Sequence, residues 1–277
     1  MIEKIMNTNE NNIEEVVKNK IAELDDKSNN ILQLGFIDAL HSNSIHKGFI
    51  PLNTRIRYSN HGVESYSMKT TDFIFEFIKL IKKYNLVSKW QIIRYLEHYI
   101  NSYFGLPGRD NREKIFYDTA LNSTSTDDEL FEALEKNEIG MLKNKQSAQC
   151  TERSAVAEQI LSVLGFEIFY CMGCVDLGNS HQEPHCFNII KRQNDYALVD
   201  YSCPVTEYNE DNSIRDYYPF VAILSNEEFI EFLNNGVIKK FTNYCFESKN
   251  GKSIMVTEDS NRSYVVGKYE IKRENQK

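Results

Sequence analysis

Three side chains of this sequence have the types and the chain order needed for acyl transfer through a thiol. Cys150 precedes a stretch with helical spacing, His185 begins an apolar run typical of a strand, and Asp200 ends the next such run. A thiol can attack a carbonyl carbon, an imidazole can carry the proton, and a carboxylate can hold the imidazole in one tautomer. We therefore take Cys150, His185 and Asp200 as candidate catalytic residues.

The expected helix places Cys150 at its N-terminus. From Ser154 onward the apolar residues repeat with helical spacing, and Gly165 follows where a left-handed cap would end the helix. Unpaired backbone N–H groups and the positive end of the helix dipole would stabilise a thiolate there, and they would also stabilise a developing oxyanion. Gln149 and Gln146 are further candidate donors to that oxyanion.

A β-hairpin is expected from two apolar runs, residues 185–191 and 196–200, which a short polar linker joins. With a linker of two or four residues, the last residue of the first strand pairs with the first residue of the second. His185 and Asp200 then become diagonal neighbours on one face, roughly 7–8 Å apart, and the carboxylate can accept the imidazole N–H. A linker of odd length would put them on opposite faces.

Four short motifs within residues 140–204 carry a family resemblance. They read Ala148-Gln149-Cys150, Leu164-Gly165-Phe166, His185-Cys186-Phe187-Asn188 and Asp200-Tyr201-Ser202. This stretch resembles the core of the transglutaminase-like superfamily, whose motifs are Gly-x-Cys, Leu-Gly-Ile, His-x-Trp-x-Glu and Asp-Pro-Thr. The resemblance implies an α+β fold with a papain/transglutaminase-like core, in which the nucleophile helix packs on an antiparallel sheet. It also implies Cys150 as nucleophile, His185 as general base and acid, and Asp200 as its orienter.

Two alternatives stay open beside this interpretation. Arylamine N-acetyltransferases share the thiol, imidazole and carboxylate, and Cys150-Thr151-Glu152 is similar to their Cys-x-Glu motif. Their cysteine follows an Arg-Gly-Gly near the N-terminus, which this sequence lacks, so we rank this reading lower. The other alternative is a catalytically silent binding module that keeps the fold.

The expected reaction is attack of Cys150 on an amide or thioester carbonyl, which leaves an acyl group on the thiol. Water as the acceptor would make the protein a peptidase, amidase or deamidase, and an amine would make it a transglutaminase or amide synthase. The expected partner is a peptide, a protein or a small amide or thioester, with an amine as optional acceptor. We expect no cofactor and no metal.

Composition points to an enzyme of the cytoplasm. The chain has 277 residues, enough for one catalytic domain with appended helices. No stretch approaches the ~20 apolar residues of a membrane span, and residues 1–12 lack the apolar region of a secretory signal. The six cysteines form no compact disulfide framework and are expected to be reduced. A net charge of −8 argues against nucleic acid or a membrane as partner and favours neutral or basic substrates.

The periodicity divides the chain into three parts. We expect a helical N-terminal region over residues 1–105, a catalytic core over residues 106–221, and a helix with antiparallel strands over residues 222–277 that completes the core. The expected helices cover residues 13–24, 71–84, 92–104 and 126–138 and a segment after Ser225; further strands are expected at residues 166–172, 241–246, 253–257 and 264–271.

Two polar segments are expected to be long loops, residues 105–125 and 202–219. The second follows Asp200 closely and mixes acidic and tyrosine side chains, which would suit a cationic amine or a basic peptide. Tyr201, Glu207 and Tyr208 are therefore candidate substrate-binding residues. A solvated surface loop is the alternative interpretation of this segment.

Three other features have a simpler explanation. Cys171 and Cys174 form a C-x-x-C, with His181 and His185 after it, but strand residues three apart face opposite sides and the spacing is too short for a zinc finger. His185 is preferred to His181 as the base, because only His185 can be placed against Asp200 by strand register. Trp90 is expected in the core rather than at an oxyanion.

Overall fold

The structure is a computed structural model, and it describes part of the chain. The described residues are 1–32, 44–47, 55–58, 63–66, 71–104, 150–176, 182–208, 210–211, 214–235, 237–238, 246–247, 253–254 and 263–266. The expected helix at 126–138 and the expected loop at 105–125 lie outside these residues.

The described elements are helices, mostly in the first half of the chain, and antiparallel strands, mostly in the second half. The helices are α1 (Ile2–Asn7), α2 (Glu10–Leu32), α3 (Thr71–Lys83), α4 (Lys89–Phe104), α8 (Cys150–Val163) and α9 (Asn226–Asn235). The strands are β1 (Ser44–Lys47), β2 (Arg55–Tyr58), β3 (Val63–Tyr66), β4 (Ile168–Asp176), β5 (Gln182–Lys191), β6 (Tyr196–Tyr208), β7 (Ile214–Leu224), β8 (Val237–Ile238), β9 (Phe246–Glu247), β10 (Ser253–Ile254) and β11 (Ser263–Val266). The expected α+β class is confirmed, as are the expected helices whose residues the structure describes.

The main sheet has the order β7-β6-β5-β4-β11-β8, and β1 also pairs with β4. All of its described pairings are antiparallel. One edge of β4 is shared between two short strands: β1 pairs with its first half, and β11 pairs with its second half. The region before residue 105 therefore contributes a strand to the sheet as well as helices. No described helix is long and apolar enough to cross a membrane.

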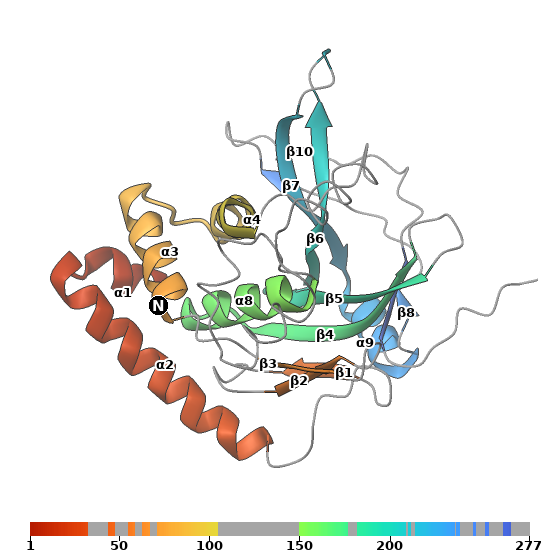
Figure 1. The fold of residues 1–277 in the computed structure, drawn as a ribbon, viewed down its shortest axis with the longest axis horizontal. Coiled ribbons are helices and arrows are strands. Elements are labelled where there is room, and N and C mark those ends of the chain that lie inside the picture. The colour runs from red at the N-terminus through yellow and green to blue at the C-terminus, as the bar shows by residue number, and fades with distance from the viewer. Residues whose placement is uncertain are drawn as a thin grey trace, which may run out of the picture.

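Helices cover both faces of the sheet. Helix α8 lies along β4 and β5 on one face, and α1, α2 and α3 pack on the same side (Figure 1). On the opposite face, Phe229 and Phe232 of α9 join Phe169, Phe187 and other strand residues in a second apolar cluster. Sheet residues alternate between the two clusters, as the period of two requires.

Helix α8 ends as its sequence predicts. Gly165 has a φ of +89°, in the left-handed region. Its N–H bonds to the Ser162 carbonyl, and the Phe166 N–H bonds to the Leu161 carbonyl, the pair of bonds that defines a Schellman cap. This cap turns the chain directly into β4 and so fixes where the sheet lies relative to the helix.

The register of the β5–β6 hairpin is confirmed. Lys191 pairs with Tyr196 across a linker of four residues, 192–195, and the pairing continues to Asn188 and Val199. An even linker puts His185 and Asp200 on one face of the sheet, the condition for contact between them.

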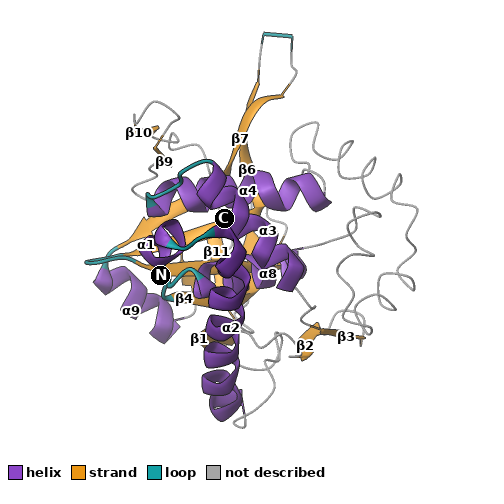
Figure 2. Ribbon diagram, turned by 90° about the vertical axis from the view of Figure 1, so that its left-hand side faces the viewer, coloured by secondary structure: helices purple, strands orange, loops and turns teal. Residues whose placement is uncertain are grey.

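The expected long loop at residues 202–219 is wrong. Strand β6 continues through Tyr208, β7 begins at Ile214, and the two pair with each other. Figure 2 shows this hairpin projecting beyond the rest of the fold. A hairpin that leaves the body has no core to cover at its tip, so its sequence need not show the apolar alternation by which strands are recognised.

The cap of α8 is testable by substitution. Gly165→Ala should lower the stability by about 1–2 kcal/mol, because an L side chain is strained at this φ. The added Cβ would also meet Met1 Cβ at 3.3 Å. The melting temperature should fall, whereas Glu15→Ala at an exposed position of α2 should leave it unchanged. Equal melting temperatures for the two variants would contradict this account.

Candidate functional site

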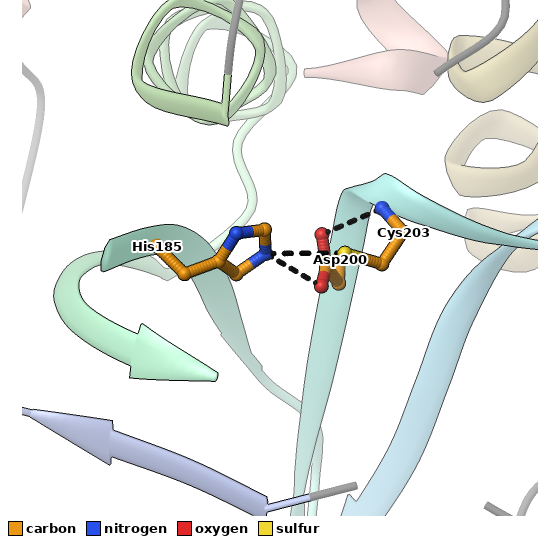
Figure 3. Close-up of side chains that lie close together, drawn as sticks. All are labelled: His185, Asp200 and Cys203. Atoms are coloured by element: carbon orange, nitrogen blue, oxygen red, sulfur yellow. Dashed lines mark hydrogen bonds and ion pairs between the residues drawn. The ribbon is translucent and has the colours of Figure 1, made fainter. Parts of the chain in front are cut away.

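His185 and Asp200 are in direct contact, as the hairpin register predicts. His185 Nε2 lies 2.8 Å from Asp200 Oδ2, and both side chains are buried (Figure 3). An imidazole N–H that donates to a carboxylate is fixed in one tautomer and orientation. Because Nε2 faces Asp200, Nδ1 is the ring nitrogen that can exchange a proton with a substrate or a nucleophile.

Four donors within the described part of the chain form hydrogen bonds with the Asp200 carboxylate. Besides His185, the Tyr264 hydroxyl donates to Oδ2 at 2.7 Å. The backbone N–H groups of Ser202 and Cys203 donate to Oδ1 at 2.8 and 3.1 Å. Asp200 has no exposed surface, and these donors replace the water that its charge has lost.

A β-bulge in β6 supplies the two backbone donors. The β6–β7 register shifts between Asp200 and Val205, so β6 has extra residues there. The bulge turns the chain back towards Asp200 and places Cys203 Sγ 3.6 Å from His185 Nε2, as Figure 3 shows. Bulges commonly re-aim side chains next to functional sites.

Cys150 is the first residue of α8 and lies beside His185. It is half-buried and packs against a small cluster on the α8 side of the sheet that includes Tyr170 and Cys186. Its thiol interacts with both Cys186 and His185. The structure therefore brings the three predicted catalytic side chains together, with Cys186 as an additional neighbour.

Two polar contacts hold the first turn of α8 in place. Asn188 Nδ2 of β5 donates to the Ser154 carbonyl at 3.1 Å, and this ties the helix to the sheet. Arg153 Nη1 donates to Asn101 Oδ1 of α4 at 2.6 Å. Helix α4 and strand β5 together position the turn that carries Cys150.

The environment of His185 favours its charged form. Burial alone would lower the pKa of the imidazole, but the Asp200 carboxylate, with smaller contributions from Cys203 and Cys150, raises it well above its ordinary value. A carboxylate in contact with an imidazole stabilises the imidazolium, so this direction follows directly from the 2.8 Å contact.

The thiol of Cys150 is not stabilised as a thiolate in this resting arrangement. The hydrogen bond with Cys186 and burial raise the pKa of Cys150 well above its ordinary value, while His185 acts in the opposite direction. Contacts with Cys186 and burial therefore act against the thiolate that the helix N-terminus is expected to favour. The thiol has to lose its proton to His185 when it reacts.

A buried carboxyl group lies behind the site, on α4. Glu97 Oε1 accepts from Asn101 Nδ2 at 2.6 Å, and Asn101 in turn accepts from Arg153. Burial, with a smaller contribution from Asp200, raises the pKa of Glu97 from 4.5 to about 8, against the opposing effects of Asn101 and Arg153. Glu97 is thus neutral at pH 7 and leaves Asp200 as the negative charge that faces His185.

The other predicted site residues do not join this group. Gln149, Gln146 and His181 lie outside the described residues. Tyr201 belongs to the core on the helical side of the sheet, where its hydroxyl donates to the Ile93 carbonyl at 3.4 Å and it has no surface for a substrate.

The candidate substrate residues further along β6 lie in the projecting hairpin. Glu207 pairs with Asp216, and Tyr208 pairs with Ile214. At the strand rise of about 3.3 Å per residue, Glu207 is roughly 20 Å of chain beyond Asp200. The placement that we expected for Glu207 and Tyr208, directly at the catalytic residues, is therefore not supported.

The simpler explanations offered for Trp90 and the C-x-x-C agree with the structure. Trp90 packs at the edge of the core. The guanidinium carbon of Arg192, the residue after the end of β5, lies 5.1 Å from the centroid of the Trp90 ring. Cys171 is buried in the cluster that faces α9, whereas Cys174 is half-buried and outside that cluster. Both thiols are free, and they do not share a side of β4.

One group in the described part of the chain has the donor set of a metal site. His185, Asp200 and Cys203 each offer a ligand atom within 4.8 Å of the others. A divalent ion would have to displace the imidazole N–H from Asp200, whose two oxygens already accept four hydrogen bonds. The arrangement fits a hydrogen-bonded carboxylate better than a metal ligand set.

Sequence reasoning missed Tyr264, Cys186 and Cys203. Pro204 could have indicated the bulge that brings Cys203 back, because proline within a strand is confined to edges and bulges. No local signal identifies Tyr264, since its position depends on pairing between β11 and the distant β4.

Comparison with known proteins adds no assignment. The sequence matches no protein-family model and no curated protein.

The buried Glu97 predicts how stability depends on pH. The folded chain keeps a proton on Glu97 that the unfolded chain loses above its pKa of 4.5, so stability should fall as the pH rises from about 4.5 to about 8. Glu97→Gln removes this cost, and it should stabilise the protein by a few kcal/mol near pH 8 and by almost nothing near pH 4. Melting temperatures across this range test it, with Glu15→Gln as an exposed control. A constant difference at all pH values would contradict a protonated Glu97.

Proposed function

We propose that this protein is a cysteine-nucleophile acyl-transfer enzyme that acts on an amide or thioester. The observation that supports it most directly is the buried contact of 2.8 Å between His185 Nε2 and Asp200 Oδ2, with Cys150 beside the same imidazole. A nucleophile next to a base, with the base oriented by a third group, is the arrangement of thiol and serine acyl-transfer enzymes.

In the proposed reaction, Cys150 Sγ attacks the carbonyl carbon while its proton passes to His185. A C–S bond forms, and the carbonyl oxygen becomes an oxyanion near the first N–H groups of α8. His185 then returns the proton to the leaving amine or thiol as its bond to the acyl carbon breaks, and an acyl-thioester remains on Cys150. Water or an amine, deprotonated by His185, attacks the thioester and releases the thiol.

Asp200 stays ionised throughout these steps. It holds the imidazole in the tautomer whose Nδ1 can accept the thiol proton, and it stabilises the imidazolium that forms. The pKa values of both Cys150 and His185 are raised, which favours the form in which both groups keep their protons. The reactive form, with one proton fewer on the pair, should therefore accumulate as the pH rises into the alkaline range.

The proposed class is the transglutaminase-like superfamily, with a papain/transglutaminase-like core. Two features support it: the order Cys150, His185, Asp200 along the chain, and a helix with the cysteine at its N-terminus packed on an antiparallel sheet. We place the protein in the cytoplasm, because the five cysteines in the described residues are all free. An arylamine N-acetyltransferase-like enzyme would use the same three residues with a different acyl donor.

Acylation of Cys150 by an activated ester is the decisive experiment. With p-nitrophenyl acetate, the wild type should release a burst of p-nitrophenol and gain one acetyl group on Cys150, detected by mass spectrometry. Cys150→Ala should abolish both signals with little loss of melting temperature, and Asp200→Asn should slow acylation by roughly 10²-fold or more. Hydroxylamine or a primary amine added afterwards reports whether the acyl group can pass to an amine.

The alternatives predict other outcomes of this experiment. A silent binding module would take up no acetyl group on Cys150 faster than the exposed lysines of the chain do. A strong fall in the melting temperature of Cys150→Ala would show that Cys150 serves the core and would contradict the proposal.

Alkylation of Cys150 tests its two neighbours in opposite directions. Cys186→Ala removes the largest cause of the raised thiol pKa, so iodoacetamide should label Cys150 faster at pH 7 than in the wild type. His185→Ala removes the group that lowers the thiol pKa, so labelling should slow. Cys171→Ala, in the cluster on the other face of β4, should not change the rate.

Mass spectrometry of the peptide that contains Cys150 gives each rate. Unchanged labelling in His185→Ala would show that the imidazole does not act on the thiol, and the acyl-transfer proposal would then fail.

A further inference from the structure

Tyr264 and His185 both contact the same carboxylate oxygen of Asp200. The Tyr264 hydroxyl donates to Asp200 Oδ2 at 2.7 Å, and His185 Nε2 lies 2.8 Å from the same atom. Tyr264 is fully buried, and the reaction proposed above assigns it no role. A buried hydroxyl that donates to a buried carboxylate makes one of the stronger hydrogen bonds in proteins.

The position of the Tyr264 hydroxyl is fixed by the packing of its ring. The ring lies edge-on to Phe187 with 4.9 Å between centroids and is stacked with Phe220 at 5.8 Å. Strand β11, which carries Tyr264, pairs with β4 so that Tyr264 is opposite Val175. The ring has no surface and no room to turn, so the hydroxyl stays aimed at Asp200.

We propose that Tyr264 is a positioning residue of this site, which holds the Asp200 carboxylate ionised and fixes Oδ2 as the oxygen that faces His185. This inference rests on the proposed acyl-transfer function. Tyr264 touches neither the substrate nor Cys150 in this role, and it acts on the reaction only through Asp200.

The distribution of donors over the two carboxylate oxygens explains why the hydroxyl matters. Oδ1 accepts from two backbone N–H groups of the bulge, which no side-chain substitution removes. Oδ2 accepts from the side chains of His185 and Tyr264. Loss of the hydroxyl would remove a donor that holds Oδ2 where it can orient the imidazole.

The other ionisable groups near Asp200 do not replace this donor. Cys203, on the same strand, contributes its backbone N–H to Oδ1, and its thiol lies 3.6 Å from His185 Nε2, the same ring nitrogen that faces Asp200. Glu97 on α4 is neutral at pH 7, since its pKa is about 8, and above that pH its charge would oppose that of Asp200. Cys150 interacts with His185. Tyr264 is therefore a second side chain, beside His185, that donates to the Asp200 carboxylate and stabilises its charge.

A double-mutant cycle with acetylation of Cys150 by p-nitrophenyl acetate as readout tests the inference. Tyr264→Phe keeps the ring and removes the hydroxyl, and we expect acylation to slow by about tenfold or more. In the Asp200→Asn background the same change should have almost no further effect, because the charge that Tyr264 supports is gone. Tyr99→Phe is the matched control, since it also loses a buried hydroxyl, one that donates to the Phe73 carbonyl at 2.8 Å.

Each outcome decides one question. If the wild type is not acylated on Cys150, the proposed function fails, and the inference fails with it. If the wild type is acylated and Asp200→Asn is slow, but Tyr264→Phe matches the wild type, the inference alone is overturned. The inference is also overturned if Tyr264→Phe slows acylation by the same factor in both backgrounds, because a purely structural role would give that result.

A measurement without the Tyr264 variant guards against a failure to fold. The slowly exchanging hydroxyl proton of Tyr264 can be followed by nuclear magnetic resonance in the wild type and in Asp200→Asn. A bond to the carboxylate predicts a downfield resonance that moves upfield in Asp200→Asn. An unchanged resonance would overturn the inference.

Discussion

The arrangement of this protein depends on a negative charge that has been taken out of water. Transfer of a carboxylate into a protein interior costs several kcal/mol even after the surroundings adjust, and hydrogen bonds must offset that cost. Asp200 obtains them from His185 on β5, from a bulge in its own strand β6 and from Tyr264 on β11. Strands β5, β6 and β11 and the bulge in β6 must therefore all be formed before the imidazole of His185 is held in place.

Local features of the site were predictable, and distant ones were not. The helix beginning at Cys150 and the register between His185 and Asp200 follow from periodicity and from an even linker, which involve neighbours in sequence. The bulge after Asp200 was not predicted, because the alternation of apolar residues does not indicate where a strand has an extra residue. The role of Tyr264 was not predicted, because β11 and β4 are far apart in the chain and their pairing depends on the tertiary structure.

The pKa of Cys150 depends on more than the position of this residue at the N-terminus of α8. A helix N-terminus stabilises a thiolate, yet the pKa of Cys150 is raised, because Cys186 and the protein interior surround it. Glu97 is neutral at pH 7, so Asp200 is the negative charge that faces His185, and the raised pKa of Cys150 keeps its thiol uncharged. A thiol in this state reacts slowly with oxidants and alkylating agents, which attack thiolates.

The place of Tyr264 in the chain has a consequence for protein synthesis. Cys150, His185 and Asp200 leave the ribosome well before β11, so a nascent chain contains these three side chains while Asp200 Oδ2 still lacks its hydrogen bond from Tyr264. Until β11 is in place, the Asp200 carboxylate lacks the hydrogen bond from the Tyr264 hydroxyl. The second half of β4 also lacks the strand that pairs with it. The set of hydrogen bonds around Asp200 is thus complete only after β11 has been synthesised and has paired with β4.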